Sequence, residues 1–184
     1  MAVIQIQDYF FAYNGNITPV FEGLNFHMDS SWRLGLVGRN GRGKTTLLRL
    51  MLGAYPFQGR IDLPLAPVYF PFAVGDERQT AFAVMRGAAP DAPGWRLRRE
   101  ASLLELNEDA LLRPFQTLSH GERTKALLCA LFSREDAYPL IDEPTNHLDL
   151  RGRELVAEYL RGKDGFLLVS HDRAFLNRCV DHVL

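Results

Sequence analysis

The stretch that decides the fold is Gly38-Arg-Asn-Gly-Arg-Gly-Lys-Thr45, which matches the phosphate-binding pattern G-x-x-x-x-G-K-[ST] without a mismatch. It follows a short apolar run at residues 32–37 and precedes the helical pattern TTLLRLMLGAY, which begins at Thr45. Strand, glycine-rich loop and helix in this order open a βαβ unit. A chance glycine-rich turn is the alternative, but it would require neither the strand nor the helix, so the sequence favours a phosphate site.

The residue types in this loop suit the phosphates of a nucleotide. Glycines let backbone N–H groups turn toward phosphate oxygens, and the start of the following helix adds a positive dipole end. We expect the Lys44 ammonium to reach the β- and γ-phosphates and the Thr45 hydroxyl to ligate Mg²⁺. The expected nucleotide-binding residues of the loop and its helix are Gly38, Arg39, Asn40, Gly41, Arg42, Gly43, Lys44, Thr45 and Thr46.

An acidic pair follows a second apolar strand, expected at residues 138–141. A carboxylate at the end of a neighbouring parallel strand can hold the Mg²⁺ bound by Thr45, and Asp142 is the candidate. Glu143 would then lie beside an attacking water, as the catalytic base. Two acids are also typical of a helix N-terminus. The phosphate-binding loop upstream favours the metal and the base over this alternative.

The segment Ser119-His120-Gly121-Glu122 has two compatible interpretations. Ser119 and Glu122, three positions apart, form a capping box at the start of a helix. The same helix start could also bind the γ-phosphate of a nucleotide that another domain presents.

Composition excludes several classes of protein. The chain has 184 residues, 21 Lys+Arg against 22 Asp+Glu, and 47% hydrophobic residues, which is typical of a folded domain. One domain spanning residues 1–184 is expected. Cys129 and Cys179 are too few for a disulfide framework, which favours a reducing, cytoplasmic location. No apolar run reaches the roughly 18 residues of a membrane span, and the neutral charge gives no support for broad nucleic-acid binding.

The remaining pattern predicts strands at both ends of the chain and helices between them. Residues 3–13 and 20–28 are expected to form two antiparallel strands, joined by a tight turn at Asn14-Gly15. Residues 56–94 are interpreted as loops and short elements. Helices are expected from Trp95, Asn107 and Ser119 and over residues 151–160, and a strand over residues 166–169.

The order of these motifs resembles that of an ABC-type ATPase. The run Glu143-Pro-Thr-Asn-His-Leu-Asp149 is similar to that of the ABC-F family, soluble twin-ATPase proteins that act on the ribosome. LSHGERTKALLCALF and SHDRAFLNRCVDHVL resemble its antibiotic-resistance and ribosome-protection branch. The resemblance covers essentially the whole chain. It implies an α/β P-loop NTPase fold with a mixed central sheet, an N-terminal antiparallel β subdomain and a small helical subdomain over about residues 74–133.

The resemblance also implies roles for residues outside the loop. Tyr13 resembles the aromatic residue that stacks on adenine; a core aromatic beside Phe10 and Phe11 is the alternative. Residues 119–122 resemble the signature that completes a partner domain's site, and Asp149 the end of the D-loop. His171 resembles the switch histidine that contacts the γ-phosphate and is counted with Glu143 as catalytic; a satisfied surface histidine is the alternative.

Three positions depart from the family pattern. Phe72 stands where most ABC ATPases place a glutamine, and phenylalanine cannot ligate Mg²⁺. The metal is therefore expected to rest on Thr45, Asp142, nucleotide and water. His120 replaces the usual second signature glycine, and Glu122 replaces a glutamine, which brings an acid near an incoming phosphate.

Taken together, the resemblance implies Mg²⁺-dependent hydrolysis of ATP by the N-terminal half of an ABC-F protein, with a second ABC domain and the ribosome as partners. The chain ends at Val183-Leu184 inside an expected element, so a linker and that second domain are expected to follow. The alternatives are the ATP-binding subunit of a membrane ABC transporter and a non-hydrolysing module, which Glu143 and His171 disfavour. Three arginines at residues 96–99 are interpreted as a solvated helix face rather than an RNA contact.

Overall fold

The computed structural model describes residues 2–15, 18–38, 41 and 43–184. Its strands are β1 Val3–Phe11, β2 Phe21–Asp29, β3 Arg33–Leu36, β4 Gln58–Asp62, β5 Ala66–Phe70, β6 Ala137–Asp142, β7 Phe166–Val169 and β8 His182–Val183. Its helices are α1 Lys44–Met51, α2 Ala81–Ala88, α3 Gly94–Leu103, α4 Glu108–Leu112, α5 His120–Ser133, α6 Leu150–Arg161 and α7 Arg173–Cys179, with a 3₁₀ turn at Phe115–Thr117.

The strands form two separate sheets, one parallel and one antiparallel. The central sheet has the order β5-β6-β7-β3-β8 and is parallel in each described pairing, whereas a mixed sheet was expected. The antiparallel strands do not join it, because β1 pairs with β2 on one side and β4 on the other. The α/β class and the N-terminal antiparallel subdomain are confirmed.

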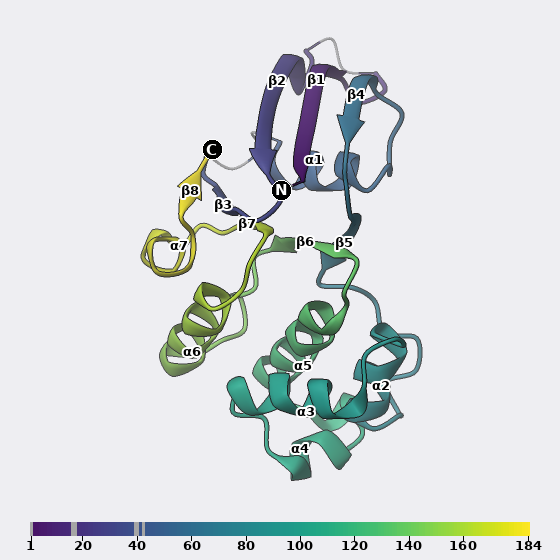
Figure 1. Cartoon of the computed structure of the whole chain (residues 1–184), viewed down its shortest axis with the longest axis vertical. Coiled ribbons are helices and arrows are strands. Elements are labelled where there is room, and N and C mark those ends of the chain that lie inside the picture. Colours follow the sequence, from purple (N-terminus) through teal and green to yellow (C-terminus); the bar gives the residue numbers. More distant parts are fainter. Residues whose placement is uncertain (1, 16–17, 39–40, 42) are drawn as a thin grey trace.

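The central sheet lies between two layers, as Figure 1 shows, and strand residues take part in two hydrophobic clusters. The antiparallel sheet and α1 lie on one side of it, and α5 and α6 on the other. Successive residues of a strand point to opposite faces of the sheet. Leu140 in β6 packs in the cluster that includes residues of β1 and α1, and Ile141 packs in the cluster that includes residues of α5 and α6. Burial on both faces explains why β6 and β7 are almost wholly apolar.

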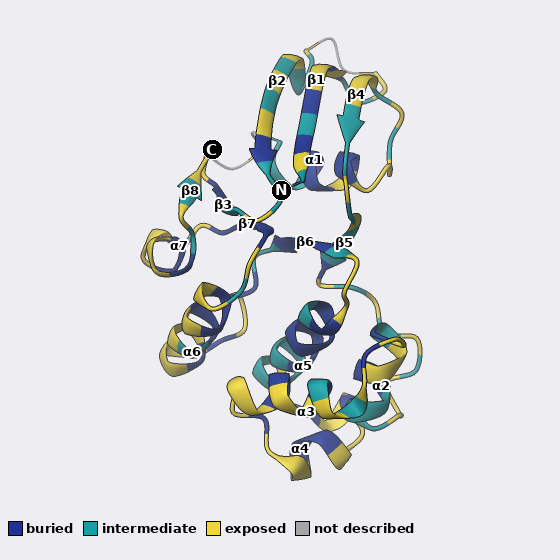
Figure 2. Ribbon diagram, viewed as in Figure 1, coloured by how far each residue is buried: buried dark blue, intermediate teal, exposed yellow. Residues whose placement is uncertain are grey.

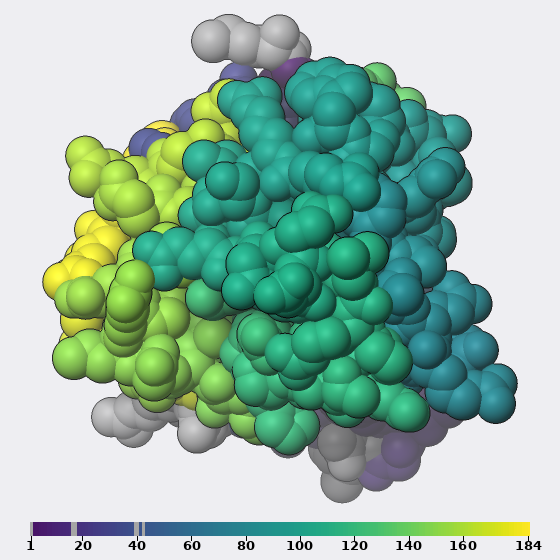
Figure 3. Space-filling model, turned by 90° about the horizontal axis from the view of Figure 1, so that it is seen from below, coloured from purple at the N-terminus to yellow at the C-terminus, as the bar shows by residue number. Residues whose placement is uncertain are grey.

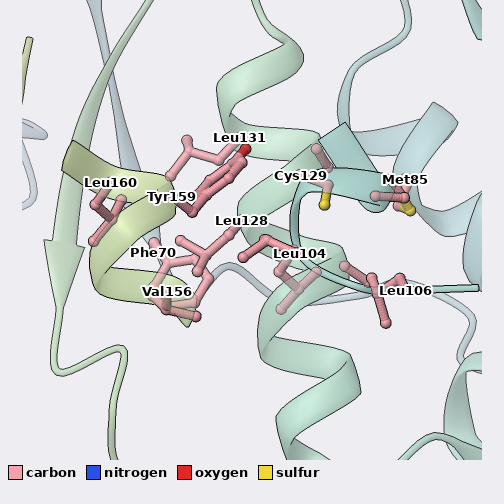
Figure 4. Packing of buried hydrophobic residues seen from close by; sticks show 14 of the residues in the cluster. Phe70, Met85, Leu104, Leu106, Leu128, Cys129, Leu131, Val156, Tyr159 and Leu160 are labelled. Carbon is pink, nitrogen blue, oxygen red and sulfur yellow. The ribbon is translucent and has the colours of Figure 1, made fainter. Parts of the chain in front are cut away.

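Helices α2 to α5 form a layer beyond the central sheet, at about the position expected for the helical subdomain. Figure 2 shows that much of α5 is buried, while exposed and buried residues both occur along α3 and α4. Seen from below, these helices, in teal and green, cover the centre of the molecule beside α6 (Figure 3). In Figure 4, Val156 and Tyr159 of α6 pack with Leu128 and Leu131 of α5.

One expectation for local structure was wrong. Asn14 and Gly15 lie in a turn, but they do not form a two-residue hairpin, because β1 ends at Phe11 and pairs there with Phe21, the first residue of β2. Gly15 has a positive φ of 86° but Asn14 does not, so the paired positive values of that turn are missing. The proline-rich stretch 56–94 contains loops and short elements, as expected: β4, β5 and α2, whose pairing and packing partners lie elsewhere in the chain.

Among the described residues, no helix is both long and apolar enough to cross a membrane. Cys129 and Cys179 are both buried free thiols.

Candidate nucleotide site

The glycine-rich loop leads directly into α1, as its pattern predicts. Gly43 precedes the helix with a φ of 88°, and a Cβ there would lie 2.7 Å from Val20 Cγ1. Both the backbone conformation and the lack of space for a side chain therefore favour glycine. The Lys44 ammonium donates to the Gly38 carbonyl at 2.7 Å, which holds its long side chain across the loop. Of the expected binding residues, Arg39, Asn40 and Arg42 lie outside the described part of the chain.

The expected metal-binding pair is assembled from two segments. The Thr45 hydroxyl donates to Asp142 Oδ2 at 2.8 Å, which joins the start of α1 to the end of β6. A hydroxyl and a carboxylate are oxygen ligands of the kind that Mg²⁺ prefers, and nucleotide oxygens and water would complete its shell. The residues present therefore fit a magnesium ion bound together with a nucleotide.

A third side chain reaches the same carboxylate, and the sequence analysis did not identify it. The Tyr69 hydroxyl, at the end of β5, donates to Asp142 Oδ2 at 2.8 Å. Burial raises the pKa of Tyr69 to about 12, with a further contribution from Asp142, so the phenol stays protonated and acts as the donor. The parallel pairing of β5 with β6 brings Tyr69 close to Asp142, and no local sequence pattern predicts this pairing.

Glu143 has an unusual backbone that directs its side chain into the site. Its φ is 48°, in the left-handed region that few non-glycine residues adopt, and its N–H donates to the Val169 carbonyl of β7 at 2.9 Å. The buried Oε1 atom has no hydrogen bond within the described residues, and His171 Nε2 lies 3.1 Å from it. The Ser170 hydroxyl is 3.4 Å from Oε2. A non-glycine residue held in the left-handed region is typical of a functional position.

The acid pair does not begin a helix, which removes the alternative of two helix N-terminal acids. The next helix, α6, begins at Leu150, and its N-cap is Asp149, whose carboxylate accepts from the Gly152 N–H at 2.7 Å. Asp142 and Glu143 therefore lie where β6 leaves the sheet, among side chains from α1 and β7 rather than at a helix dipole.

The surroundings of Tyr13 are compatible with both interpretations, stacking on adenine and packing in the core. Its hydroxyl lies 2.9 Å from Thr46 Oγ1, and its half-buried ring packs edge-on against Phe11 and Tyr55. The same ring lines the cavity above α1. Tyr13 lies two residues after the end of β1.

These elements surround a cavity of about 370 Å³ at the carboxyl ends of the parallel strands. Its lining includes Tyr13, Gly41, Gly43, Lys44, Thr45, Thr46, Asp142, Glu143 and His171. Ligands of open α/β sheets bind in this place. The structure thus brings together, around one cavity, the described residues expected to bind phosphate, metal and attacking water, except Gly38, which does not line it.

The segment 119–122 lies on a different cavity, of about 460 Å³, which it shares with Asp149. Both halves of the capping box are formed: the Glu122 N–H donates to Ser119 Oγ at 3.2 Å, and Ser119 N–H donates to Glu122 Oε2 at 2.8 Å. Burial alone would raise the pKa of Glu122, but the hydrogen bonds from Ser119 outweigh it and lower the pKa. The rings of His120 and His147 lie 5.0 Å apart, centroid to centroid.

Phe72 and the arginines at residues 96–99 play packing and pairing roles. Phe72 is half-buried against the cluster that includes the helical layer, not in the nucleotide cavity. Arg96 forms an ion pair with Glu135 at 2.8 Å, and Arg98 lies over the Phe82 ring. These contacts favour the solvated, paired helix face over an RNA contact.

Comparisons with known proteins identify relatives of this chain. Relatives of this chain include ABC transporter F family member 2 of Arabidopsis thaliana, 28% identical over the whole chain. They also include ribosome protection protein VmlR of Bacillus subtilis, 34% identical over 94% of the chain, and ATP-binding protein Uup of Caulobacter vibrioides, 32% identical over 89%. The chain spans between 27% and 29% of the length of these three relatives.

Solved structures share the fold. The inward-facing structure of a metal-chelate type ABC transporter superposes with a TM-score of 0.82 at 23% identity, covering 99% of this chain and 78% of that one. An ATP-bound Atm1-family exporter gives 0.81 at 18%, covering 99% and 36%. The model of the ABC transporter family matches residues 21–146, more than half of the chain. The chain therefore belongs to the ABC transporter family, as an ATPase domain.

Proposed function

We propose that this chain binds ATP with Mg²⁺ and hydrolyses it, as one ATPase half of an ABC-F type protein that acts on the ribosome in the cytoplasm. The observation that carries the ATPase proposal is the Thr45–Asp142 hydrogen bond on the same cavity wall as the buried Glu143 Oε1, which lies 3.1 Å from His171 Nε2. It supports a metal site and a proton acceptor on the wall of one cavity.

In the proposed mechanism, the described glycines of the loop and Lys44 bind the β- and γ-phosphates. Thr45 and Asp142 would hold Mg²⁺, which neutralises charge developing on the transferred phosphoryl group. Glu143 Oε1 accepts a proton from the water that attacks the γ-phosphorus, while the bond to the ADP oxygen breaks. His171, next to Glu143, orients the γ-phosphate and the base. ADP and inorganic phosphate are the products.

A complete site requires a second ABC domain under this proposal. The segment 119–122 lines a separate cavity from the phosphate loop, which supports its acting on a nucleotide held by a partner. The partner would be the second half of the full-length protein. An ATP-bound pair would then close with each phosphate loop facing the other domain's Ser119–Glu122 counterpart.

Ribosome binding is supported by the identity to VmlR, which is named a ribosome protection protein, and to ABC transporter F family members. The second candidate is the ATP-binding subunit of a membrane ABC transporter, which the family match supports as well. Ribosome cosedimentation of the full-length protein with ATP separates the two. Retention on ribosomes by a Glu143→Gln variant supports the ABC-F proposal, and its absence favours the transporter.

Two variants test the ATPase proposal. Lys44→Ala should abolish measurable binding of a fluorescent ATP analogue, because it removes the ammonium expected at the β- and γ-phosphates. Glu143→Gln should retain binding but lower hydrolysis by roughly 10²–10⁴-fold, since an amide cannot accept the proton. Equal affinity in Lys44→Ala, or wild-type turnover in Glu143→Gln, would contradict these assignments.

A further inference from the structure

One hydroxyl at the site belongs to none of the recognised motifs. Tyr69 lies in β5, and its phenol and the Thr45 hydroxyl both donate to Asp142 Oδ2, each at 2.8 Å. The two donors approach from different elements, since α1 carries Thr45 and β5 carries Tyr69. Two hydrogen bonds that converge on one oxygen fix the rotation of a carboxylate and leave the other oxygen for a further partner.

Packing alone does not explain this contact. The Tyr69 ring is half-buried against the cluster around α1, and a phenol in that position needs a hydrogen-bond partner. Solvent could supply one, because Tyr69 also lines an open cavity of about 410 Å³ together with Thr45 and Asp142. The phenol instead donates to the carboxylate, a charge-assisted bond of the stronger kind.

We infer that Tyr69 is a positioning residue for the metal-binding carboxylate of Asp142. Thr45 is itself an expected ligand of the ion, so Tyr69 is the donor that orients the carboxylate from outside the ligand set. Partners of this kind typically change metal affinity about 10–100-fold when they are removed. The inference rests on the proposed function, because it assumes that Mg²⁺ binds with ATP at Thr45 and Asp142.

The test compares Tyr69→Phe with Tyr55→Phe in the full-length protein. Tyr55 is a half-buried tyrosine near α1 whose hydroxyl lies 3.5 Å from Arg49, so its substitution removes a phenol without touching Asp142. Binding of a fluorescent ATP analogue is measured in EDTA and across a Mg²⁺ titration. Electron paramagnetic resonance of Mn²⁺ measures the ion directly.

We expect Tyr69→Phe to raise the Mg²⁺ midpoint, and the Mn²⁺ dissociation constant, about 10-fold. Affinity in EDTA should stay at the wild-type value, and Tyr55→Phe should match the wild type throughout. Coincident metal titrations for the two variants would overturn the inference, as would an equal loss of affinity with and without metal. A wild type that binds no nucleotide under either condition would instead refute the proposed function, and the inference with it.

Discussion

A buried carboxylate joins the helical layer to the end of α6, and its removal should be costly. The Glu100 side chain in α3 is 7% exposed and forms an ion pair with Lys163, which is 15% exposed. Glu100 also accepts a hydrogen bond from the Tyr159 hydroxyl at 2.5 Å. Burial raises the pKa of Tyr159 well above its usual value, so the phenol remains a donor. Glu100→Ala therefore leaves two buried donors without their acceptor.

The expected loss follows from this burial. Removing one partner of a buried ion pair costs about 3–5 kcal/mol, and we expect about 3 kcal/mol here because Lys163 keeps some contact with water. For a chain of this length the melting temperature should fall by roughly 6–12 °C. Urea unfolding followed by circular dichroism measures the loss. Glu135→Ala is the control: its side chain pairs with Arg96 but is 74% exposed, so the loss should stay below about 1 kcal/mol.

Lys163→Ala and the double variant test the pairing itself. Each single change leaves the other charged group unpaired, whereas the double change removes both. The combined loss should therefore be smaller than the sum of the single losses by about 0.5–3 kcal/mol. Additive losses, or a loss for Glu100→Ala no larger than that for Glu135→Ala, would refute the reasoning.

Three further predictions follow from the site and its helices. Gly43→Ala should weaken binding of a fluorescent ATP analogue, because the φ of Gly43 is 88° and the new Cβ would lie 2.7 Å from Val20 Cγ1. Gly87→Ala is the control: its new Cβ meets nothing within 4 Å, so binding should be unchanged in the same titration. Glu122→Gln should destabilise the fold at neutral pH but not in acid. Hydrogen bonds from Ser119 outweigh burial and lower the folded-state pKa of Glu122. The contribution of Glu122 to the free energy of unfolding is therefore present above the unfolded-state pKa of about 4.3, and it is lost as the pH falls through the folded-state pKa. Urea midpoints of wild type and variant across this range should converge at low pH, and a constant difference would contradict the shift. The 184-residue chain should hydrolyse ATP slowly, with specific activity that rises with protein concentration as two copies pair; phosphate release over a hundredfold range of concentration measures this, and a high, flat turnover would contradict the two-domain site.

Features that depend on neighbouring residues could be predicted from the sequence. The capping box of Ser119 and Glu122 closes over three positions, and the cap of α4 at Asn107 has the same spacing. The strand β7 and the start of α1 were also recognised, because an apolar run and a glycine-rich loop are local patterns. Hydrogen bonds within one turn depend little on the rest of the fold.

The tight turn at Asn14-Gly15 shows where local patterns mislead. The dipeptide favours a two-residue hairpin, but the strands pair at Phe11 and Phe21, and the connecting loop carries Tyr13 to Thr46. Long-range contacts with α1 replaced the local preference. The short elements expected over residues 56–94 were not given bounds for a related reason, since β4 and β5 are each stabilised by a partner strand rather than by their own pattern.

The sequence by itself determined that a phosphate loop, an acid pair and a histidine follow strands in an order typical of this fold. Only the tertiary structure decided how they meet: Thr45 and Asp142 are 97 positions apart, and Tyr69 and Asp142 are 73 apart. The parallel pairing of β5 with β6, β6 with β7 and β7 with β3 brings these residues together, because it aligns the carboxyl ends of the strands at one edge. The left-handed backbone of Glu143, anchored to Val169 of β7, depends on the same pairing, and no local pattern encodes it.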